Sequence, residues 1–369
     1  MGQGSSESSP PTVGVKQTVF RKNSKVIYRI PALFYFEEKE MFLAFAEKRS
    51  GPRDEDAEVL VMSKLHKGDN QWSEPGELQK AHMKPCRTMS PCPVYERTTK
   101  TLYLFFNCVY DKVPERTQID KKINLARLCY ITTKDAQTWS EVTDLTDVGE
   151  IGEKVKDWST FAIGPGHGIQ TENNTLIIPA YAYHKDTKKP HAFVFSSSDI
   201  GKTWHVEKRI EEECGECQVA EVIDSKGSHL YCNARGSKVR VEAVSENYGK
   251  TFGKAKHPKV LTEPKYGCQG SVIAFQPRVD KTQTWLLFTH PSDKKERKDV
   301  AVYLNKSPFN SDAWEKKRTI NGGRSAYSDV VYVEKEDHFA CLVECGKNSE
   351  YDQIDFLRCT PGDLGLDTL

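Results

Sequence analysis

Apolar residues occur along this chain in short blocks, each separated from the next by Gly, Pro, Asn, Asp and Ser. Blocks of about 4–8 residues that are rich in Val, Ile, Leu, Phe and Tyr are typical of β-strands. Apolar residues at helical spacing are scarce, so the pattern predicts an all-β protein. The blocks that predict strands are ALFYF, MFLAFAE, EVLVMSKL, TLYLFFNCVY, LARLCYITT, TLIIPAYAY, HAFVFSSS, QVAEVI, HLYCNA, VRVEAVS, SVIAFQP, TWLLFTH, VAVYLN, VVYVEK and FACLVEC.

A short phrase recurs among these blocks. SSDIGKTW ends at Trp204, SENYGKTF ends at Phe252, and weaker copies end at Trp72, Trp139 and Trp314. The successive spacings of these aromatic residues are 67, 65, 48 and 62 residues, the differences between their numbers. Each interval has room for about four strands, which is the size of one propeller blade. We therefore expect a six-bladed β-propeller with antiparallel four-stranded blades.

The recurring phrase has two interpretations. Its Ser, Asp and Thr residues could bind a cation or a phosphate, or they could form a turn that repeats with the architecture. In a turn, Asp199 would accept hydrogen bonds from its own backbone, Gly201 would adopt a positive φ, and Trp204 would pack between sheets. Because an active site is normally built once, the repetition favours the structural turn.

The charge balance and the terminus narrow the class of protein. With 53 basic and 52 acidic residues, the net charge of +1 argues against nucleic-acid binding. No apolar run approaches the roughly 20 residues that span a bilayer, and MGQGSSESSPPTVG has no apolar core typical of a signal peptide. We expect a cytoplasmic protein with a disordered segment at 1–14 and a single domain at 15–369.

Two further motifs could indicate a lipid anchor and a metal or redox site. Gly2 and Ser6 fit the M-G-x-x-x-[ST] pattern of N-myristoylation, so peripheral membrane association stays open. The CGEC motif at 214–217 would need a second cysteine pair to bind zinc or a βαβ unit for redox chemistry. Neither is visible, so we expect the 11 cysteines to be reduced and mostly buried.

Residues that do not repeat are the candidates for chemistry. Arg29 lies in YRIPAL, Glu221 in CQVAEV, Arg235 in YCNARG and Tyr327 in NGGRSAYSDV. A lone charge among apolar strand residues is costly unless it is paired or bound to a ligand. The segment AFAEKRSGPRDEDAE is also charged, although such a loop is often a solvated surface.

These residues stand in motifs that resemble the animal exo-α-sialidases, or neuraminidases, over nearly the full chain. The resemblance is to the vertebrate cytosolic and plasma-membrane-associated branch, and the recurring phrases resemble that family's Asp boxes. The motifs occur in family order: YRIPAL, AFAEKR, DEDAE, MSPCPV, WSTFAIGPGHGIQ, PAYAY, CQVAEV, NARG, GCQGSV, THPSDKKERKDVAVYLN and SAYSDV.

The resemblance implies three arginines for the sialic acid carboxylate, at Arg29, Arg235 and Arg297. A guanidinium suits this role because its planar fork binds a carboxylate through two hydrogen bonds and keeps its charge. The segment around Arg297, KKERKD, is rich in charge, so an ordinary surface arginine is the alternative there.

The resemblance also implies the catalytic residues. Tyr327 is the implied nucleophile, since the anionic substrate would repel a carboxylate in that role, and Glu221 is the implied base that takes its proton. Asp54 is the implied acid that protonates the departing oxygen and later activates water. Asp56 is the alternative by charge alone, but the motif RDEDAE favours Asp54.

Further substrate contacts are implied by the same motifs. Glu47 would orient the arginines and Arg49 would contact the sugar. The remaining pocket residues would surround the N-acyl and glycerol groups, and they are Met89, Tyr181, Tyr183 and Gln269. Ser90 occupies a position where many relatives have Asn, which leaves open the preference among N-acetyl, N-glycolyl and deaminated sialic acids.

We therefore predict a retaining exo-α-sialidase that acts on sialylated glycolipids, glycoproteins or oligosaccharides through a tyrosyl-enzyme intermediate. No metal or other cofactor is expected, because guanidinium groups supply the positive charge. The alternatives are a propeller that binds sialoglycans without hydrolysis and a relative that transfers sialic acid to another sugar. A lectin would not need the nucleophile and its base, whereas a transferase would need an acceptor site that the sequence does not display.

Overall fold

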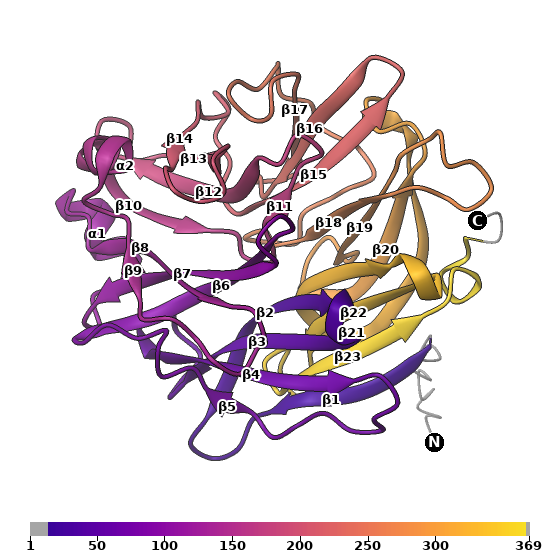
Figure 1. The fold of residues 1–369 in the computed structure, drawn as a ribbon, viewed down its shortest axis with the longest axis horizontal. Coiled ribbons are helices and arrows are strands. Elements are labelled where there is room, and N and C mark those ends of the chain that lie inside the picture. The colour runs from indigo at the N-terminus through magenta and orange to yellow at the C-terminus, as the bar shows by residue number, and fades with distance from the viewer. Residues whose placement is uncertain (1–13, 367–369) are drawn as a thin grey trace, which may run out of the picture.

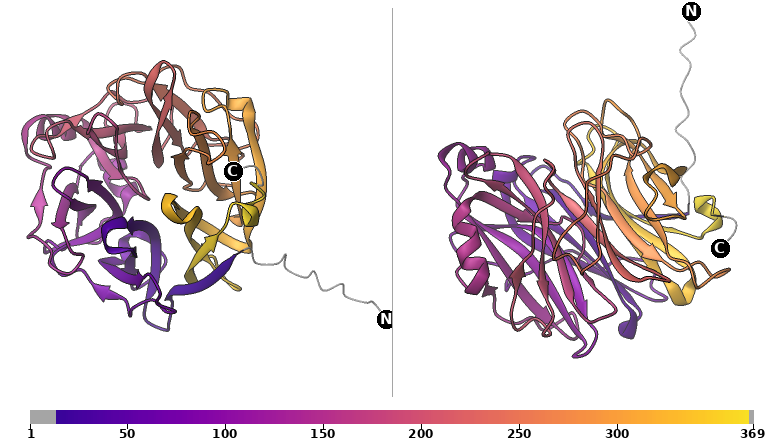
Figure 2. Two further views of the ribbon diagram at one scale, coloured as in Figure 1. Left: turned by 45° about the vertical axis from the view of Figure 1, so that its right-hand side comes forward. Right: turned by 90° about the horizontal axis from the view of Figure 1, so that it is seen from above.

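The structure is a computed structural model that describes residues 14–366. Antiparallel sheets follow one another around a central region, as Figure 1 and Figure 2 show. The prediction of an all-β protein is confirmed, and the arrangement is propeller-like. The predictions for residues 1–13, which include the myristoylation pattern at Gly2, lie outside the described residues.

Residues 14–366 form five sheets, and the first half of the chain contributes three of them. The first contains β2 (Ile27–Phe36), β3 (Met41–Arg49), β4 (Ala57–His66) and β5 (Gly76–Glu77). The second contains β6 (Cys86–Glu96), β7 (Thr101–Tyr110), β8 (Ala126–Thr133) and β9 (Thr143–Asp144). The third contains β10 (Trp158–Ile163), β11 (Ile169–Gln170), β12 (Leu176–His184), β13 (Pro190–Ser197) and β14 (His205–Val206).

The second half forms two sheets. One contains β15 (Cys217–Asp224), β16 (Gly227–Ala234) and β17 (Val241–Ser245). The other has seven strands in the order β1-β23-β22-β21-β20-β19-β18. Its strands are β1 (Val15–Arg21), β18 (Ser271–Phe275), β19 (Trp285–Pro291), β20 (Lys298–Asn305), β21 (Trp314–Val333), β22 (His338–Cys345) and β23 (Gln353–Cys359).

Helices are short. The α-helices are α1 (Glu115–Lys121) and α2 (Gly149–Lys154). The 3-10 turns are η1 (Glu37–Lys39), η2 (Asp54–Asp56), η3 (Val155–Asp157), η4 (Ser311–Ala313), η5 (Glu334–Glu336) and η6 (Gly362–Leu364). Within residues 14–366, no helix has the length and apolar content that a membrane crossing requires.

All the predicted strand blocks lie in strands, but four longer strands were not predicted: β1, β6, β10 and β23. In β6, Pro91 and Pro93 interrupt the apolar block, and the register shifts between Met89 and Cys92. In β23, Asp355 is fully buried because Lys16 of β1 pairs with it at 2.9 Å. Prolines and buried charges remove the hydrophobic signal on which strand prediction depends.

A polar network joins the innermost strands. The carboxylate of Asp329 on β21 accepts hydrogen bonds from Leu33 N on β2 and Ser271 Oγ on β18, each at 2.7 Å. His167 Nδ1 also lies 2.7 Å from it. This fully buried carboxylate therefore fixes three segments relative to β21, two residues from Tyr327.

The recurring phrase is a structural turn, as its repetition predicts. Asp199 Oδ1 accepts hydrogen bonds from Lys202 N (3.1 Å) and Thr203 N (2.9 Å), and Gly201 has a φ of +78°. The aromatic residues then pack on a neighbouring sheet. Their ring-centroid distances are 5.1 Å for Trp72–Phe356, 6.5 Å for Trp139–Phe45, 4.8 Å for Trp204–Phe105 and 6.4 Å for Trp314–Tyr231.

Asp199→Ala is expected to lower the melting temperature without changing KM. The turn loses a side-chain cap that contributes about 0.5–2 kcal/mol, and Ser197, which precedes it, pairs with Leu176 at the end of β12 away from Tyr181. Differential scanning calorimetry and initial-rate kinetics would measure the two effects. A large change in KM at unchanged stability would contradict the structural role.

Candidate active site

A pocket opens where several strands end. It has a volume of about 390 Å³ and joins a smaller, deeper cavity of about 80 Å³. Five residues line both: Asp54, Glu115, Tyr181, Glu216 and Tyr327. Segments far apart in the sequence therefore share one site, which contains both positive and negative groups.

Arg29, Arg235 and Arg297 all line the wider pocket. Arg29 donates from Nε and Nη2 to the two oxygens of Glu344, at 3.2 and 3.3 Å, and Glu344 is fully buried. The pair fixes the guanidinium in the way that a bidentate contact with a carboxylate does. The guanidinium of Arg29 also lies 4.1 Å from the ring centroid of Tyr351.

Arg235 and Arg297 both lie next to Tyr327. Arg235 Nη1 donates to Glu216 Oε2 at 2.8 Å and to the Tyr327 hydroxyl at 3.2 Å. The Arg297 guanidinium lies 5.3 Å from the centroid of the Tyr327 ring and donates to Gly267 O at 3.0 Å. Positive charge is thus concentrated around one phenol.

Tyr327 has an acceptor for its proton. Its hydroxyl donates to Glu216 Oε1 at 2.5 Å. Burial and the charge of Glu216 raise the pKa of Tyr327 well above its usual value, while Arg235 and Arg297 oppose that shift. The phenol is therefore protonated in the empty site, and a base and two cations are in place to stabilise the phenolate.

The prediction that Glu221 is this base is wrong. Glu221 lies within β15, where its carboxylate accepts hydrogen bonds from Glu172 N (2.8 Å) and Ser228 Oγ (2.5 Å). Glu216 and Glu221 are separated by five residues, about 16 Å along an extended strand. Glu216 immediately precedes β15, so it lies at the end of the sheet where Arg235 follows β16.

Asp54 stands at the edge of the pocket on η2, and its side chain is 56% exposed. Arg49 Nη1 donates to Asp54 Oδ1 at 2.9 Å. Partial desolvation by the walls of the pocket raises the pKa of Asp54, but Arg49 and Arg29 outweigh it and hold the pKa below its usual value. Asp56 is held differently, because both the backbone and the side chain of Arg53 donate to it.

Glu47 and Arg49 both line the deeper cavity. Arg49 is fully buried, and its Nε donates to Glu47 Oε2 at 2.7 Å. Glu47 Oε1 accepts a hydrogen bond from Ser90 N at 2.7 Å. Glu47 therefore orients Arg49 and the backbone of Ser90. Among the described residues, Glu47 makes no hydrogen bond or ion pair with Arg29, Arg235 or Arg297.

The remaining predicted pocket residues differ in which cavity they line. Met89 and Ser90 line the deeper cavity, Tyr183 lines the wider pocket, and Tyr181 lines both. Gln269 lines neither, because its side chain is hydrogen-bonded to the backbone of Pro165 and Ser328. Gln269 was predicted to form part of the pocket around the N-acyl and glycerol groups, and this prediction is wrong because main-chain groups occupy its amide.

Two acidic residues that line both the pocket and the deeper cavity, Glu115 and Glu216, were not predicted. Glu216 lies inside CGEC, where the cysteines drew attention to metal and redox chemistry. Cys214 and Cys217 are buried free thiols, and within residues 14–366 no group of side chains could hold a metal ion. Glu115 begins α1, and nothing in its sequence context distinguishes it from a surface residue.

Glu115 has an unusual charge state. Burial, together with the charges of Asp54 and Glu216, raises its pKa to about 7. It is therefore neutral below this pH and negative above it. We expect KM for an α-sialoside, which is an anion, to rise by about threefold to tenfold between pH 6 and 8, as close like charges repel by about 1 kcal/mol.

Glu115→Gln should remove this rise, because glutamine stays neutral. Steady-state kinetics across this pH range would measure it, with Glu153→Gln on the exposed face of α2 as the control. An identical dependence of KM on pH in Glu115→Gln and the wild type would contradict the assignment.

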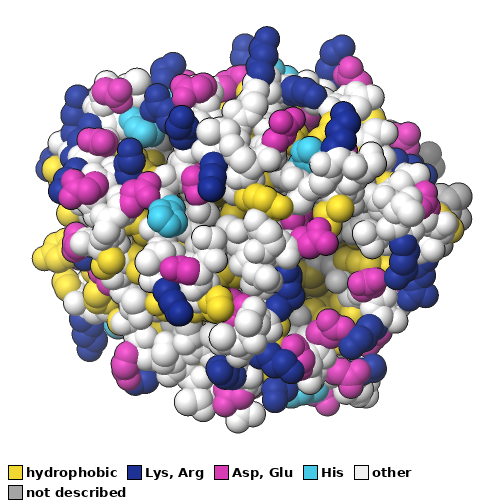
Figure 3. Space-filling model, turned by 45° about the horizontal axis from the view of Figure 1, so that its top comes forward, with side chains coloured by type: hydrophobic (Ala, Val, Ile, Leu, Met, Phe, Trp, Pro, Cys, Tyr) yellow, Lys and Arg dark blue, Asp and Glu magenta, His cyan; other side chains and the backbone are white. Residues whose placement is uncertain are grey.

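On the face of the molecule shown in Figure 3, basic and acidic side chains are interspersed, without one dominant sign.

Comparison with known proteins places this site in a family. Residues 40–339 match the model of the BNR repeat-like domain. Mouse Sialidase-3 is 43% identical over 395 aligned positions that cover 94% of each chain. Mouse Sialidase-2 is 40% identical and covers 94% of this chain and 95% of its own.

Solved structures agree in fold. The Hadza microbial sialidase Hz136 superposes with a TM-score of 0.77 at 20% identity, over 92% of this chain and 66% of its own. The family and the activity follow from the mouse relatives, which are 43% and 40% identical over nearly the whole chain: the chain belongs to the animal sialidase family and is an exo-sialidase, a glycoside hydrolase.

Proposed function

We propose that the protein is a retaining exo-α-sialidase that works through a tyrosyl-enzyme intermediate. The observation that carries the proposal is the 2.5 Å hydrogen bond from the Tyr327 hydroxyl to Glu216, formed beside Arg235. Sialic acid has a carboxylate on its anomeric carbon, and Arg29, Arg235 and Arg297 provide donors for it. The same arginines lie against Tyr327, so binding the carboxylate brings the anomeric carbon to the nucleophile.

The first step forms one bond and breaks one. Tyr327 Oη attacks the anomeric carbon while its proton passes to Glu216, and the glycosidic bond breaks with its electron pair on the departing oxygen. Asp54 gives that oxygen a proton. In the second step Asp54 takes a proton from water, and the water oxygen attacks the anomeric carbon from the face that the departing oxygen left, which displaces Tyr327 and retains the configuration. Glu216 returns the first proton to Tyr327 Oη.

Asp54 must be protonated for the first step, although its pKa is low in the empty site. The substrate carboxylate neutralises part of the charge of Arg29, and the sugar displaces water from Asp54. Both changes raise the pKa of Asp54 in the complex. This proposal favours activity at mildly acidic pH.

Covalent trapping tests the intermediate. A sialic acid fluorinated at carbons 2 and 3 reacts at the anomeric carbon and releases fluoride, and the 3-fluoro group slows the hydrolysis that follows. Peptide mass spectrometry is expected to find the sugar on Tyr327. An active enzyme without an adduct, or one labelled at Glu216 or Asp54, would contradict the proposal.

The architecture supports a finer description of the fold. We propose six blades within one domain, because β21 spans 20 residues and its two halves pair with β20 and with β22. The seven-stranded sheet then counts as two four-stranded blades that share β21. Pairing of β1 with β23 completes the last blade from both ends of the chain.

We propose sialylated glycolipids, glycoproteins or oligosaccharides as substrates, in agreement with the sialidase names of the relatives. A cytoplasmic location, with or without peripheral attachment to membranes, also remains a proposal. Hydrolysis of α2-3, α2-6 and α2-8 sialosides, and cell fractionation, would test them.

Ser90 offers a test of substrate preference. It lines the deeper cavity of about 80 Å³ and has a φ of +56°, a conformation that Asn adopts readily. Ser90→Asn would fold but would fill part of the cavity. We expect the kcat/KM ratio of N-glycolyl to N-acetyl substrates to fall by about tenfold, the usual effect of one added group in a pocket; an unchanged ratio would place the N-acyl group elsewhere.

A further inference from the structure

The loop 264–268 lies behind two of the arginines that line the pocket. We propose that Glu263 and Arg240 are positioning residues, which hold this loop so that it orients Arg235 and Arg297. The inference rests on the proposed function, in which these arginines bind the substrate carboxylate.

The loop contacts both guanidinium groups through its main chain. Arg235 Nη2 donates to Tyr266 O, and Arg297 donates from Nε and Nη2 to Gly267 O at 3.3 and 3.0 Å. Two adjacent carbonyl groups thus accept hydrogen bonds from the two guanidinium groups, Tyr266 O from Arg235 and Gly267 O from Arg297. Nη1 of Arg235 donates to Glu216 and to the Tyr327 hydroxyl, and Nη1 of Arg297 donates to the Tyr351 hydroxyl.

The loop backbone is not in a relaxed conformation. Tyr266 and Gly267 both have left-handed φ angles, +69° and +68°, and for a residue other than Gly this conformation is unfavourable. Tyr266 is 79% exposed, so packing of its side chain in the core does not offset the unfavourable backbone conformation. A strained segment of this kind persists only when its surroundings hold it.

Glu263 and Arg240 hold both sides of Cys268, at the end of the loop. Glu263 Oε2 accepts a hydrogen bond from Cys268 N at 2.9 Å, and Arg240 Nη1 donates to Cys268 O at 2.7 Å. The two side chains are fully buried and joined by an ion pair of 2.9 Å. Glu263 Oε1 also accepts a hydrogen bond from Gly236 N (3.2 Å), next to Arg235.

Glu263 has further support from His290, whose Nε2 lies 3.2 Å from Oε2. Burial raises the pKa of Glu263, but Arg240 and His290 outweigh it and lower the pKa to about 2. The carboxylate is therefore ionised at every pH at which the enzyme is expected to act. It connects the backbone beside Arg235 with the loop that contacts Arg297.

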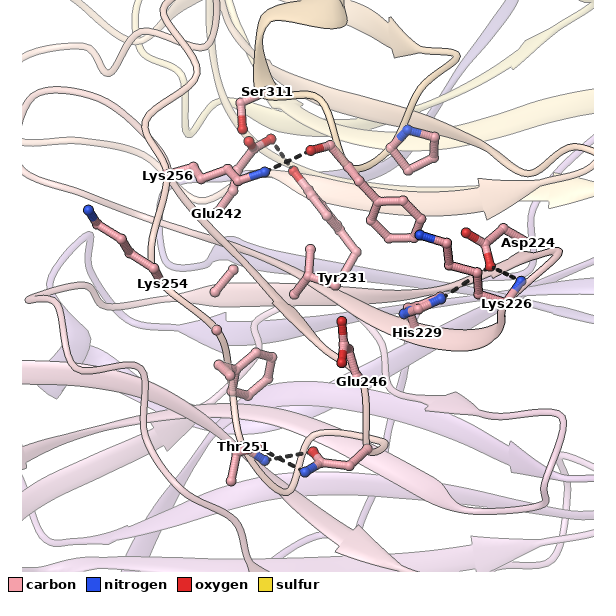
Figure 4. A pocket seen from close by; sticks show the side chains of 17 residues that line it. Asp224, Lys226, His229, Tyr231, Glu242, Glu246, Thr251, Lys254, Lys256 and Ser311 are labelled. Carbon is pink, nitrogen blue, oxygen red and sulfur yellow. Dashed lines mark hydrogen bonds and ion pairs between the residues drawn. The ribbon is translucent and has the colours of Figure 1, made fainter.

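Glu242 provides a matched control for substitution at Glu263. It is a buried glutamate on β17, two residues from Arg240, and it accepts hydrogen bonds from Tyr231 and from Trp314 Nε1 (2.5 Å). Figure 4 shows it beside Tyr231, Ser311 and Lys256 in a separate cavity of about 680 Å³. This cavity includes none of the residues that line the pocket of Tyr327.

The experiment compares Glu263→Gln with Glu242→Gln in the full chain. Both variants lose a buried carboxylate and are expected to have lower melting temperatures. Only Glu263→Gln is expected to raise KM for a fluorogenic α-sialoside and the Ki of a sialic acid glycal, each by about tenfold or more, a factor that corresponds to 1.4 kcal/mol. Its kcat should change by less than about threefold, since Tyr327, Glu216 and Asp54 are intact.

A glycine pair provides a second test if Glu263→Gln fails to fold. In Gly267→Ala the new Cβ would lie 2.6 Å from Arg235 Nε, so the guanidinium must move and KM should rise. Gly68→Ala is its control, because Gly68 also has a positive φ (+90°) but no atom within 4 Å of the added Cβ. Its KM should match that of the wild type.

Equal changes of KM in the two glutamine variants, an unchanged KM in Glu263→Gln, or an unchanged KM in Gly267→Ala would overturn the inference. Arg297→Met, measured in parallel, separates this failure from that of the proposed function. If Arg297→Met leaves KM unchanged, Arg297 does not bind the carboxylate, and the part of the proposed function on which this inference rests fails. If it raises KM while Glu263→Gln does not, only the positioning role is excluded.

Discussion

Glu216→Gln is expected to lower kcat for an α-sialoside by about 10²–10⁴, the usual contribution of a positioned general base. Glutamine keeps the shape of the side chain, but it cannot take the proton that Tyr327 Oη must lose. The 2.5 Å hydrogen bond and the raised pKa of Tyr327 make this loss the difficult part of the first step. Stopped-assay or fluorogenic kinetics at mildly acidic pH would measure it.

Glu221→Gln is the matched control for this prediction. Glu221 is an acidic residue of the same sheet, bound to Glu172 N and Ser228 Oγ away from the pocket. Its substitution should affect stability and leave kcat within about twofold, as a residue with no part in the transition state does. A large loss of kcat in Glu221→Gln with normal kcat in Glu216→Gln would reverse the assignment of the base.

Arg297→Met is expected to lower kcat/KM by about 10²–10³, because a desolvated charge pair with the substrate contributes about 2–5 kcal/mol. Arg297 is the cleanest of the three arginines to remove. Arg29 and Arg235 each pair with a carboxylate, Glu344 and Glu216, which would be left without its partner. Arg297 instead donates to Gly267 O and to the Tyr351 hydroxyl, which are neutral.

The control for Arg297 is an arginine outside the pocket. Arg278 is 49% exposed and pairs with Asp337, so Arg278→Met should leave kcat/KM unchanged. Melting temperatures of both variants would show whether folding is affected. If Arg297→Met and Arg278→Met had the same kcat/KM, Arg297 would be an ordinary surface residue, the alternative that its charged sequence context suggested.

The sequence by itself determined the fold class. The apolar pattern of a strand is contained in its own four to eight residues, so most strands of the sheets can be predicted from the sequence. The recurring turn is also local, since Asp199 bonds to amides within four residues of itself. Strands with an interrupted pattern were missed, among them β6 with two prolines and β23 with the buried Asp355, whose partner Lys16 comes from the other end of the chain.

The motifs also brought Arg29, Arg235, Arg297, Asp54 and Tyr327 to attention, and the structure gathers all five around one pocket. Only the tertiary structure decided between Glu216 and Glu221. The sequence does not show which glutamate lies at the strand end and which lies within the strand, although the two are about 16 Å apart along it. Likewise, the amide of Gln269 is used by backbone groups from other strands, and Glu115 acquires its pKa of about 7 from residues distant in the chain. The sequence determines interactions between residues that are close along the chain, whereas the partner of each charged side chain depends on which distant segments the fold brings together.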